Sequence, residues 1–299
     1  MKKRILAALL VFVALLTGCN RKETPGQWPS QKIEIDVCYT AGGTADTVAR
    51  QLSALMSQQL STTFNLVNVT GGSGSIAGQQ VYAAAHDGYT WLGDVAHTVS
   101  GWRTLGYADL GWEDFYGFYA ASSPYVLFVS GNSPYQTAQQ LFDAMRGDPS
   151  MKWGNAGLGS INQLTGSLML EKLGLKGNSV PYDGGRSAAI KVVAGEVTWS
   201  WCGLSDILDL AQSGDIRILG ICDSSPREID CAKGNYTVPS LLDDYPELSD
   251  LQGLLYWGFR VSRDTPADAV AKIRDAFQST VDSKEWRSFA RPKGWSLRQ

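Results

Sequence analysis

The sequence predicts an α/β fold built as two lobes, and two observations lead to that prediction. First, short apolar strands are followed by glycine-containing turns and then by helices whose apolar residues recur every three or four positions. Second, this order occurs in both halves of the 299-residue chain, on either side of a bridging segment. Strands that alternate with helices through tight turns form mostly parallel sheets, so each half is expected to form one lobe.

The first half carries the clearest strand. Ile33, Ile35 and Val37 alternate with charged residues, which predicts a strand over 33–39. Apolar residues at spacings of three and four predict a helix over 45–60. The same reasoning gives strands over 64–69 and 89–92 and a helix over 76–85.

The second half repeats the alternation. We expect strands over 125–130, 152–154, 179–182, 197–201 and 216–222, with helices over 137–145, 161–173 and 187–194. A last strand over 254–261 and a helix over 267–281 are expected to return to the first lobe. Lobe 1 is therefore predicted to comprise residues 31–122 plus 249–299, and lobe 2 residues 123–248.

The N-terminal segment is typical of a secretory signal. Three basic residues precede an apolar run of 12 residues, 5–16, which is shorter than the roughly 20 residues that a membrane span needs. The following Leu16-Thr17-Gly18-Cys19 resembles the lipobox of bacterial lipoproteins, which implies a signal peptide over 1–18 and a diacylated Cys19. Residues 19–30 are mostly polar and are expected to form a tether between the anchor and the folded lobes. A retained anchor, a buried helix and an ordinary signal peptide are the alternatives.

Composition excludes several classes of partner and cofactor. Cleavage before Cys19 leaves 23 basic and 29 acidic residues, and an acidic exported chain is a poor candidate for nucleic-acid binding. The chain has two histidines and no CxxC spacing, so we expect no metal site. Four cysteines remain beyond Cys19 and permit two disulfides in three connectivities; we favour Cys222–Cys231, which are close in sequence.

Three glycine turns carry the chemistry that the sequence allows. Each lies between a strand and a helix, at residues 40–44, 71–75 and 155–160. Such a turn presents unpaired backbone N–H groups and the positive end of a helix dipole, which together bind anions. No basic residue lies within 40–46, 70–78 or 154–160, so the turns could hold a carboxylate or a phosphate without side-chain charge. One turn alone would more often be simple turn chemistry.

The sequence of these turns gives little support to an enzymatic function. Gly72 to Ala77 fits the dinucleotide pattern G-x-G-x-x-A, but it follows the second strand of an exported chain, so we expect no nucleotide cofactor. Residues 71–75 fail the G-x-S-x-G pattern of hydrolases at the last position. The sequence therefore favours binding without catalysis, and we expect no cofactor.

The turns also carry a resemblance to a known family. Trp28-Pro29-Ser30-Gln31-Lys32-Ile33 resembles the opening "WPSKPI" of the solute-binding proteins of tripartite tricarboxylate transporters, the TctC or Bug proteins. Other motifs follow in the family's order, at 40–50, 71–78, 87–90, 153–160, 181–185 and 238–241. The resemblance implies a type II periplasmic-binding-protein-like fold, a Venus flytrap that closes on its ligand by a hinge motion. It also implies integral membrane transporter subunits as partners.

The resemblance further implies which residues bind ligand. Asp46 could accept a hydrogen bond from a ligand hydroxyl or amine, or could simply be a first-turn helix residue. Asp183 departs from the family, which has Lys there. In lobe 1 the implied contacts are Thr40, Gly42, Gly43, Thr44, Asp46, Gly72, Ser73 and Ser75. In lobe 2 they are Asn155, Ala156, Gly157, Ser160 and Tyr182, with Gly203 on the far wall.

The sequence thus predicts a monomeric, exported lipoprotein that captures a small carboxylate for a tripartite tricarboxylate-type transporter. The lipid anchor would hold it at the membrane, facing the periplasm or the cell exterior. An orphan sensor that reports ligand to a membrane receptor and a secreted hydrolase are the alternatives. The sequence does not separate a transport receptor from a sensor.

Overall fold

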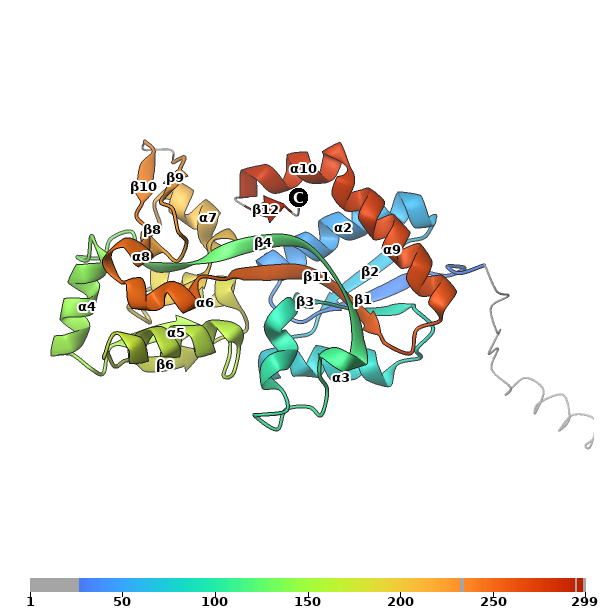
Figure 1. Ribbon diagram of the computed structural model, residues 1–299, viewed down its shortest axis with the longest axis horizontal. Helices are drawn as coiled ribbons and strands as arrows, with labels where there is room; N and C mark the ends of the chain where they lie inside the picture. The colour runs from blue at the N-terminus through green and yellow to red at the C-terminus, as the bar shows by residue number, and fades with distance from the viewer. Residues whose placement is uncertain (1–26, 232–233, 294, 298–299) are drawn as a thin grey trace, which may run out of the picture.

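The computed structural model describes residues 27–231, 234–293 and 295–297 and has two lobes joined by two strands (Figure 1). The predicted signal peptide, Cys19 and most of the predicted tether lie outside the described residues. Within the described residues, no helix is long and apolar enough to cross a membrane.

The first lobe is built on β1, a strand at Ile33–Val37 that pairs in parallel with β2 and β3. Helices α2 and α9 pack on one face of this sheet and α3 on the other, which gives two separate apolar clusters (Figure 1). Its other elements are α2 (Thr44–Leu60), β2 (Phe64–Asn68), η1 (Gly72–Gly74), α3 (Ser75–Ala83), β3 (Thr90–Val95), η2 (Ala96–Gly101), η3 (Trp112–Asp114), α9 (Ala267–Asp282), α10 (Lys284–Ala290), η5 (Arg291–Lys293) and β12 (Ser296–Leu297).

The second lobe is built on β5, a strand at Lys152–Asn155 that pairs in parallel with β6 and β7. A short antiparallel pair, β9 with β10, lies beside β8. The remaining elements are α4 (Ala138–Gly147), α5 (Ile161–Lys172), β6 (Asn178–Pro181), α6 (Gly185–Val193), β7 (Trp199–Gly203), α7 (Leu204–Ser213), β8 (Ile216–Ile221), β9 (Arg227–Ile229), β10 (Tyr236–Val238), α8 (Leu241–Asp244) and η4 (Pro246–Leu251).

The lobes share β4, a strand at Phe115–Ser130 that the sequence analysis predicted only from residue 125. Up to Pro124 this strand pairs with β11 (Leu254–Ser262), which also pairs with β3 of the first lobe. From Tyr125 onward it pairs instead with β7 and β8 of the second lobe. Because β4 runs through the sheets of both lobes, it has no single point at which one lobe ends. The predicted boundaries between the lobes, at residues 122/123 and 248/249, therefore stay a proposal.

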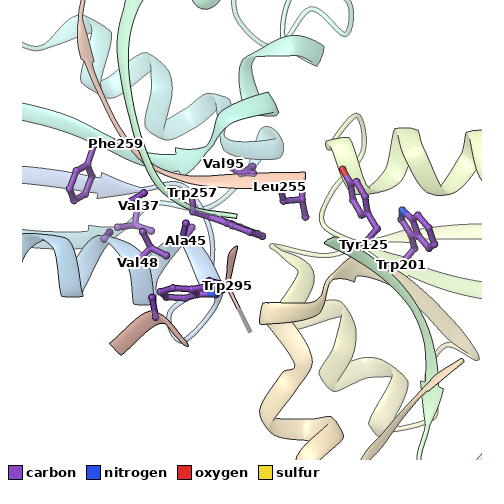
Figure 2. Packing of buried hydrophobic residues seen from close by; sticks show 14 of the residues in the cluster. Val37, Ala45, Val48, Val95, Tyr125, Trp201, Leu255, Trp257, Phe259 and Trp295 are labelled. Atoms are coloured by element: carbon purple, nitrogen blue, oxygen red, sulfur yellow. The ribbon is translucent and has the colours of Figure 1, made fainter. Parts of the chain in front are cut away.

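The apolar core continues across the junction between the lobes. Figure 2 shows Leu255 and Trp257 reaching from β11 between the first lobe and the stacked rings of Tyr125 and Trp201. These two rings lie 5.3 Å apart at an interplanar angle of 9°, and Trp201 is fully buried. Aromatic side chains of this size contribute a large share of the buried apolar area of a core.

The predicted Cys222–Cys231 disulfide is wrong, because both side chains are free thiols. Cys222 belongs to the large core cluster and its Sγ lies 3.9 Å from the carbonyl oxygen of Leu248. Cys231 packs at the edge of a different cluster, with its Sγ 3.5 Å from the carbonyl oxygen of Ala211. Proximity in sequence did not bring the two sulfur atoms together, since the intervening segment carries them to different cores.

Candidate ligand-binding site

The three glycine turns meet where the lobes face each other. The hydroxyl of Ser73, in the second turn, donates to the carbonyl oxygen of Leu158 in the third over 2.7 Å. The first turn contacts lobe 2 as well: the backbone N–H of Thr40 donates to the carbonyl oxygen of Asp183 over 3.1 Å, and its hydroxyl lies 3.1 Å from that of Ser187. The two lobes are therefore closed on each other.

The first turn ends at the N-terminus of α2, which has no side-chain cap from its own segment because its cap position is Gly43. The missing acceptor comes from Asp206, in the first turn of α7 of the other lobe. Its Oδ1 accepts from the backbone N–H of Thr44 over 3.1 Å and from the Thr44 hydroxyl over 2.7 Å. Burial raises the pKa of Asp206, while the Thr44 donors and the charge of Arg186 oppose that rise.

Arg186 is a cation beside this contact. Its guanidinium donates to the backbone carbonyl oxygen of Asp206 over 3.2 Å and forms a two-pronged ion pair with the carboxylate of Asp209, one arm of which spans 2.7 Å. Such a paired arrangement fixes the guanidinium plane. The charge of Arg186 is therefore held at the wall of the site while its donors are largely engaged.

Two cavities lie between the lobes, and they share Tyr39 and Ala156 in their walls. The smaller has a volume of about 30 Å³ and lies at the N-termini of α2 and α6, beside Asp206. The larger has a volume of about 520 Å³ and lies between the second and third glycine turns. Lys191, which pairs with Glu196 over 2.7 Å, stands at the edge of the larger cavity.

The predicted site residues divide into those that line these cavities and those that do not. Thr40, Gly43, Thr44 and Ala156 line the smaller cavity. Gly72, Ser73, Ala156, Gly157 and Tyr182 line the larger one. Neither of the two cavities is lined by Gly42, Asp46, Ser75, Asn155, Ser160 or Gly203.

Asp46 belongs to the second group because its carboxylate faces its own lobe. It accepts hydrogen bonds from the backbone N–H of Gly42, from Arg50 and from Asn68, each over 3.0 Å. Burial raises the pKa of this carboxyl, but the three donors and the charge of Arg50 outweigh burial and leave the pKa below its usual range. Of its two predicted roles, the contacts favour the first-turn helix residue that shapes the binding loop.

Asn155 and Ser160 shape the third turn in the same way. The side-chain oxygen of Asn155 accepts from the backbone N–H of Gly157 over 3.0 Å, and its amide donates to Ser179 over 2.7 Å. The hydroxyl of Ser160 accepts from the backbone N–H of Gln163 over 3.2 Å and so caps α5. These side chains hold the turn rather than face the cavities.

Two glycines are required by close approach. A Cβ on Gly157 would lie 2.8 Å from the hydroxyl oxygen of Ser73 across the cleft, and the φ of Gly157 is +118°. A Cβ on Gly203 would lie 2.9 Å from the ring of Trp257. Gly157 thus permits the lobes to meet, whereas Gly203 permits the core beneath the site to pack.

Sequence reasoning missed Arg186, Lys191 and Asp206. Arg186 directly follows the quoted motif at 181–185, which could have extended the search to it. Asp206 lies in α7, a helix that was not predicted, so the only available signal was an acidic residue shortly after a buried strand. In the described part of the chain, no group of three His, Cys, Asp or Glu side chains could hold a metal ion.

Two lobes linked by shared strands, with a cleft between them, form the α/β fold of the periplasmic-binding-protein class. Residues 48–295 match the family described as the tripartite tricarboxylate transporter family receptor, TctC, and the chain belongs to that family. This confirms the predicted family, the fold class and the expectation of a transport receptor rather than an enzyme.

Relatives and solved structures agree with this assignment. The chain is 29% identical to the UPF0065 protein in the tcbD-tcbE intergenic region of Pseudomonas sp. strain P51, over 94% of this chain and 82% of the relative. It superimposes on MatC from Rhodopseudomonas palustris with bound malate at a TM-score of 0.79 and 22% identity, covering 90% of this chain and 91% of MatC. It also superimposes on R. palustris Rpa4515 with adipate, at a TM-score of 0.78 and 24% identity, covering 90% of this chain and 89% of Rpa4515.

Proposed function

We propose that the protein is an exported receptor, anchored through lipidated Cys19, that captures a small carboxylate between its lobes for a tripartite tricarboxylate-type transporter. Membership of the TctC family supports the transport role and the integral membrane subunits as partners. The structures of MatC with malate and Rpa4515 with adipate support a ligand with two carboxylates. The two-lobed fold agrees with this role.

One observation carries the proposal: the N-terminus of α2 already binds a carboxylate, that of Asp206. Two donors of Thr44, the backbone N–H and the hydroxyl, converge on one oxygen of that group. A helix N-terminus with an open cap position favours an anion through its orphan N–H groups and its dipole. A ligand carboxylate would meet the same donors, with Arg186 in the adjoining wall.

The contact set follows from the cavities. We assign ligand contact to Thr40, Gly43 and Thr44 in the smaller cavity, and to the residues of the second and third turns around the larger one, Gly72, Ser73, Ala156, Gly157 and Tyr182. The larger cavity, at about 520 Å³, falls within the range of small-molecule sites. We assign to the remaining predicted residues the role of positioning the binding turns rather than contacting ligand: Gly42, Asp46, Ser75, Asn155, Ser160 and Gly203.

Ligand class is tested by thermal unfolding and calorimetry of the mature chain with malate, adipate and citrate. Binding to the native state raises the melting temperature, by an amount that grows with the logarithm of the ligand concentration above Kd. The dimethyl ester of adipate is the matched control, because it keeps the carbon chain and removes both charges. We expect at least one free acid to bind and the diester not to bind. Equal binding of acid and diester, or no binding by any acid, would contradict a carboxylate receptor.

The anchor is tested separately by fractionation. The full-length chain is expected in the membrane fraction, with a mass increase on Cys19 from the diacylglycerol group. The Cys19→Ser variant should lose that mass and leave the membrane fraction. A chain that is soluble with Cys19 present would refute the anchor without touching the ligand assignment.

A further inference from the structure

We propose that Asp206 is a built-in competitor for the ligand: its carboxylate occupies the anion site at the N-terminus of α2 and latches the lobes together until a ligand carboxylate displaces it. This inference rests on the proposed function, because it concerns the same site. It adds a residue that opposes binding, and it links ligand exchange to opening of the lobes.

The latch joins opposite lobes. Asp206 belongs to α7 of lobe 2, while both of its donors belong to Thr44 at the start of α2 in lobe 1. The Thr44 hydroxyl also lies 3.0 Å from the hydroxyl oxygen of Ser205, which adds a second interlobe contact at the same point. Opening of the lobes must break these contacts, so they stabilise the closed arrangement.

The second oxygen of the carboxylate lies at another helix N-terminus. A Cβ built on Gly185, the first residue of α6, would lie 2.6 Å from Oδ2 of Asp206. The cap position of α6 is Gly184, and it makes no side-chain cap, as with Gly43 before α2. Asp206 is therefore enclosed between two helix starts that both favour an anion. It is only 9% exposed.

Volume decides between co-binding and competition. With Asp206 in place, the cavity at the start of α2 measures about 30 Å³. That space suits about one or two water molecules, not a carboxylate and its carbon chain. A second carboxylate there would also be repelled by the charge of Asp206 at short range. A ligand that uses the Thr44 donors must therefore first expel the side chain of Asp206.

The test compares the wild-type chain with Asp206→Ala, the isosteric Asp206→Asn and the matched control Asp215→Asn. Asp215 is an exposed carboxylate just beyond the end of α7, so its replacement gives the same charge change without touching Thr44. Calorimetry with malate and adipate should show at least tenfold tighter binding by Asp206→Ala, a smaller gain for Asp206→Asn and no change for Asp215→Asn. Circular dichroism verifies that each variant is folded.

Small-angle scattering supplies a second readout that needs no cognate ligand. Without added carboxylate, Asp206→Ala should have a larger radius of gyration than the wild type, because the latch is missing. Acetate should return that radius to the wild-type value by filling the vacated anion site, and it should not alter the wild type. An Asp206→Ala chain with unchanged radius and affinity would overturn the latch and leave Asp206 a structural residue.

The outcomes also separate the two proposals. Tenfold weaker binding by Asp206→Ala would overturn competition, because it would make Asp206 a ligand contact while leaving the carboxylate receptor intact. If neither the wild type nor any variant binds a carboxylate ligand, the proposed function fails. In that case the latch is judged by scattering alone. It is supported if Asp206→Ala has a larger radius of gyration than the wild type and acetate reverses the increase, and it is refuted if either change is absent.

Discussion

The hydroxyl of Ser73 in the first lobe donates a hydrogen bond to the carbonyl oxygen of Leu158 in the second, over 2.7 Å. This bond joins the second glycine turn to the third and closes one side of the larger cavity. Ser73 holds a left-handed conformation, with φ of 50°, within the turn that starts α3. Closure of the lobes therefore depends on a side chain placed by an uncommon backbone shape.

Replacing Ser73 with Ala should weaken ligand binding by roughly 2- to 10-fold, since a hydrogen bond contributes about 0.5–1.5 kcal/mol to the state that contains it. The open arrangement lacks this hydrogen bond, so the substitution removes no comparable interaction from it. Calorimetry with the best carboxylate measures the effect. Ser57→Ala, which removes an exposed hydroxyl from the far end of α2, is the control and should bind as the wild type does.

Gly101 provides a steric test of closure. A Cβ on this residue would lie 2.7 Å from the backbone carbonyl oxygen of Gly159 in the opposite lobe, closer than packed atoms allow. Gly101→Ala should therefore hold the lobes apart and lower carboxylate affinity at least tenfold. Gly147→Ala is the matched control, because a Cβ there meets nothing within 4 Å. Unchanged affinity in Gly101→Ala would show that binding does not need this closed arrangement.

Asp46 gives a prediction in pH. Its pKa is lowered in the folded chain, so ionised Asp46 stabilises the fold above the unfolded value near 3.9, and that contribution is lost as pH falls through the lower folded value. Asp46→Asn should destabilise the chain by about 1–3 kcal/mol at pH 7. The difference from wild type should shrink below about pH 4. Urea unfolding at several pH values tests this, and a pH-independent difference would argue against the ionised role.

The buried ion pair between Arg260 and Asp94 gives a prediction in stability. The two side chains are 1% and 0% exposed, and Nε lies 2.6 Å from Oδ2. Arg260→Met would leave Asp94 buried without its cation, which typically costs about 3–5 kcal/mol. Chemical denaturation measures this loss. Adding Asp94→Asn to Arg260→Met should recover part of it, and an equal or larger loss in the double variant would contradict the explanation.

The same pair has a pH signature. Burial raises the pKa of Asp94 to about 6 even though Arg260 opposes the rise. Without Arg260 the folded pKa should be higher still, so Arg260→Met is most stable where Asp94 is protonated, below its unfolded value near 3.9. Its stability relative to wild type should then fall as pH rises from about 6, the folded pKa of Asp94 in the wild type, toward the higher folded pKa of Asp94 in the variant. A deficit that does not grow with pH would argue that lost packing, not charge, explains the cost.

Strand and helix positions were largely predictable because they follow local periodicity. The strand at Ile33–Val37 and the helix ending at Leu60 lie where alternation and spacing placed them. The helix Leu204–Ser213 was missed, although its apolar residues recur at helical spacing. The early part of β4 was missed because its pairing with β11, a partner distant in the chain, makes it a strand.

The sequence by itself determined the glycine turns and the family, and it led to the prediction of an anion-binding site, because turn chemistry and helix starts are local properties. Only the tertiary structure decided what those turns face. It turned Asp46 toward Arg50 and away from the cleft, and it left Cys222 and Cys231 apart. It also brought Asp206 from 162 residues away onto Thr44. Contacts between distant residues depend on how the lobes pack, and no local pattern in the chain records that packing.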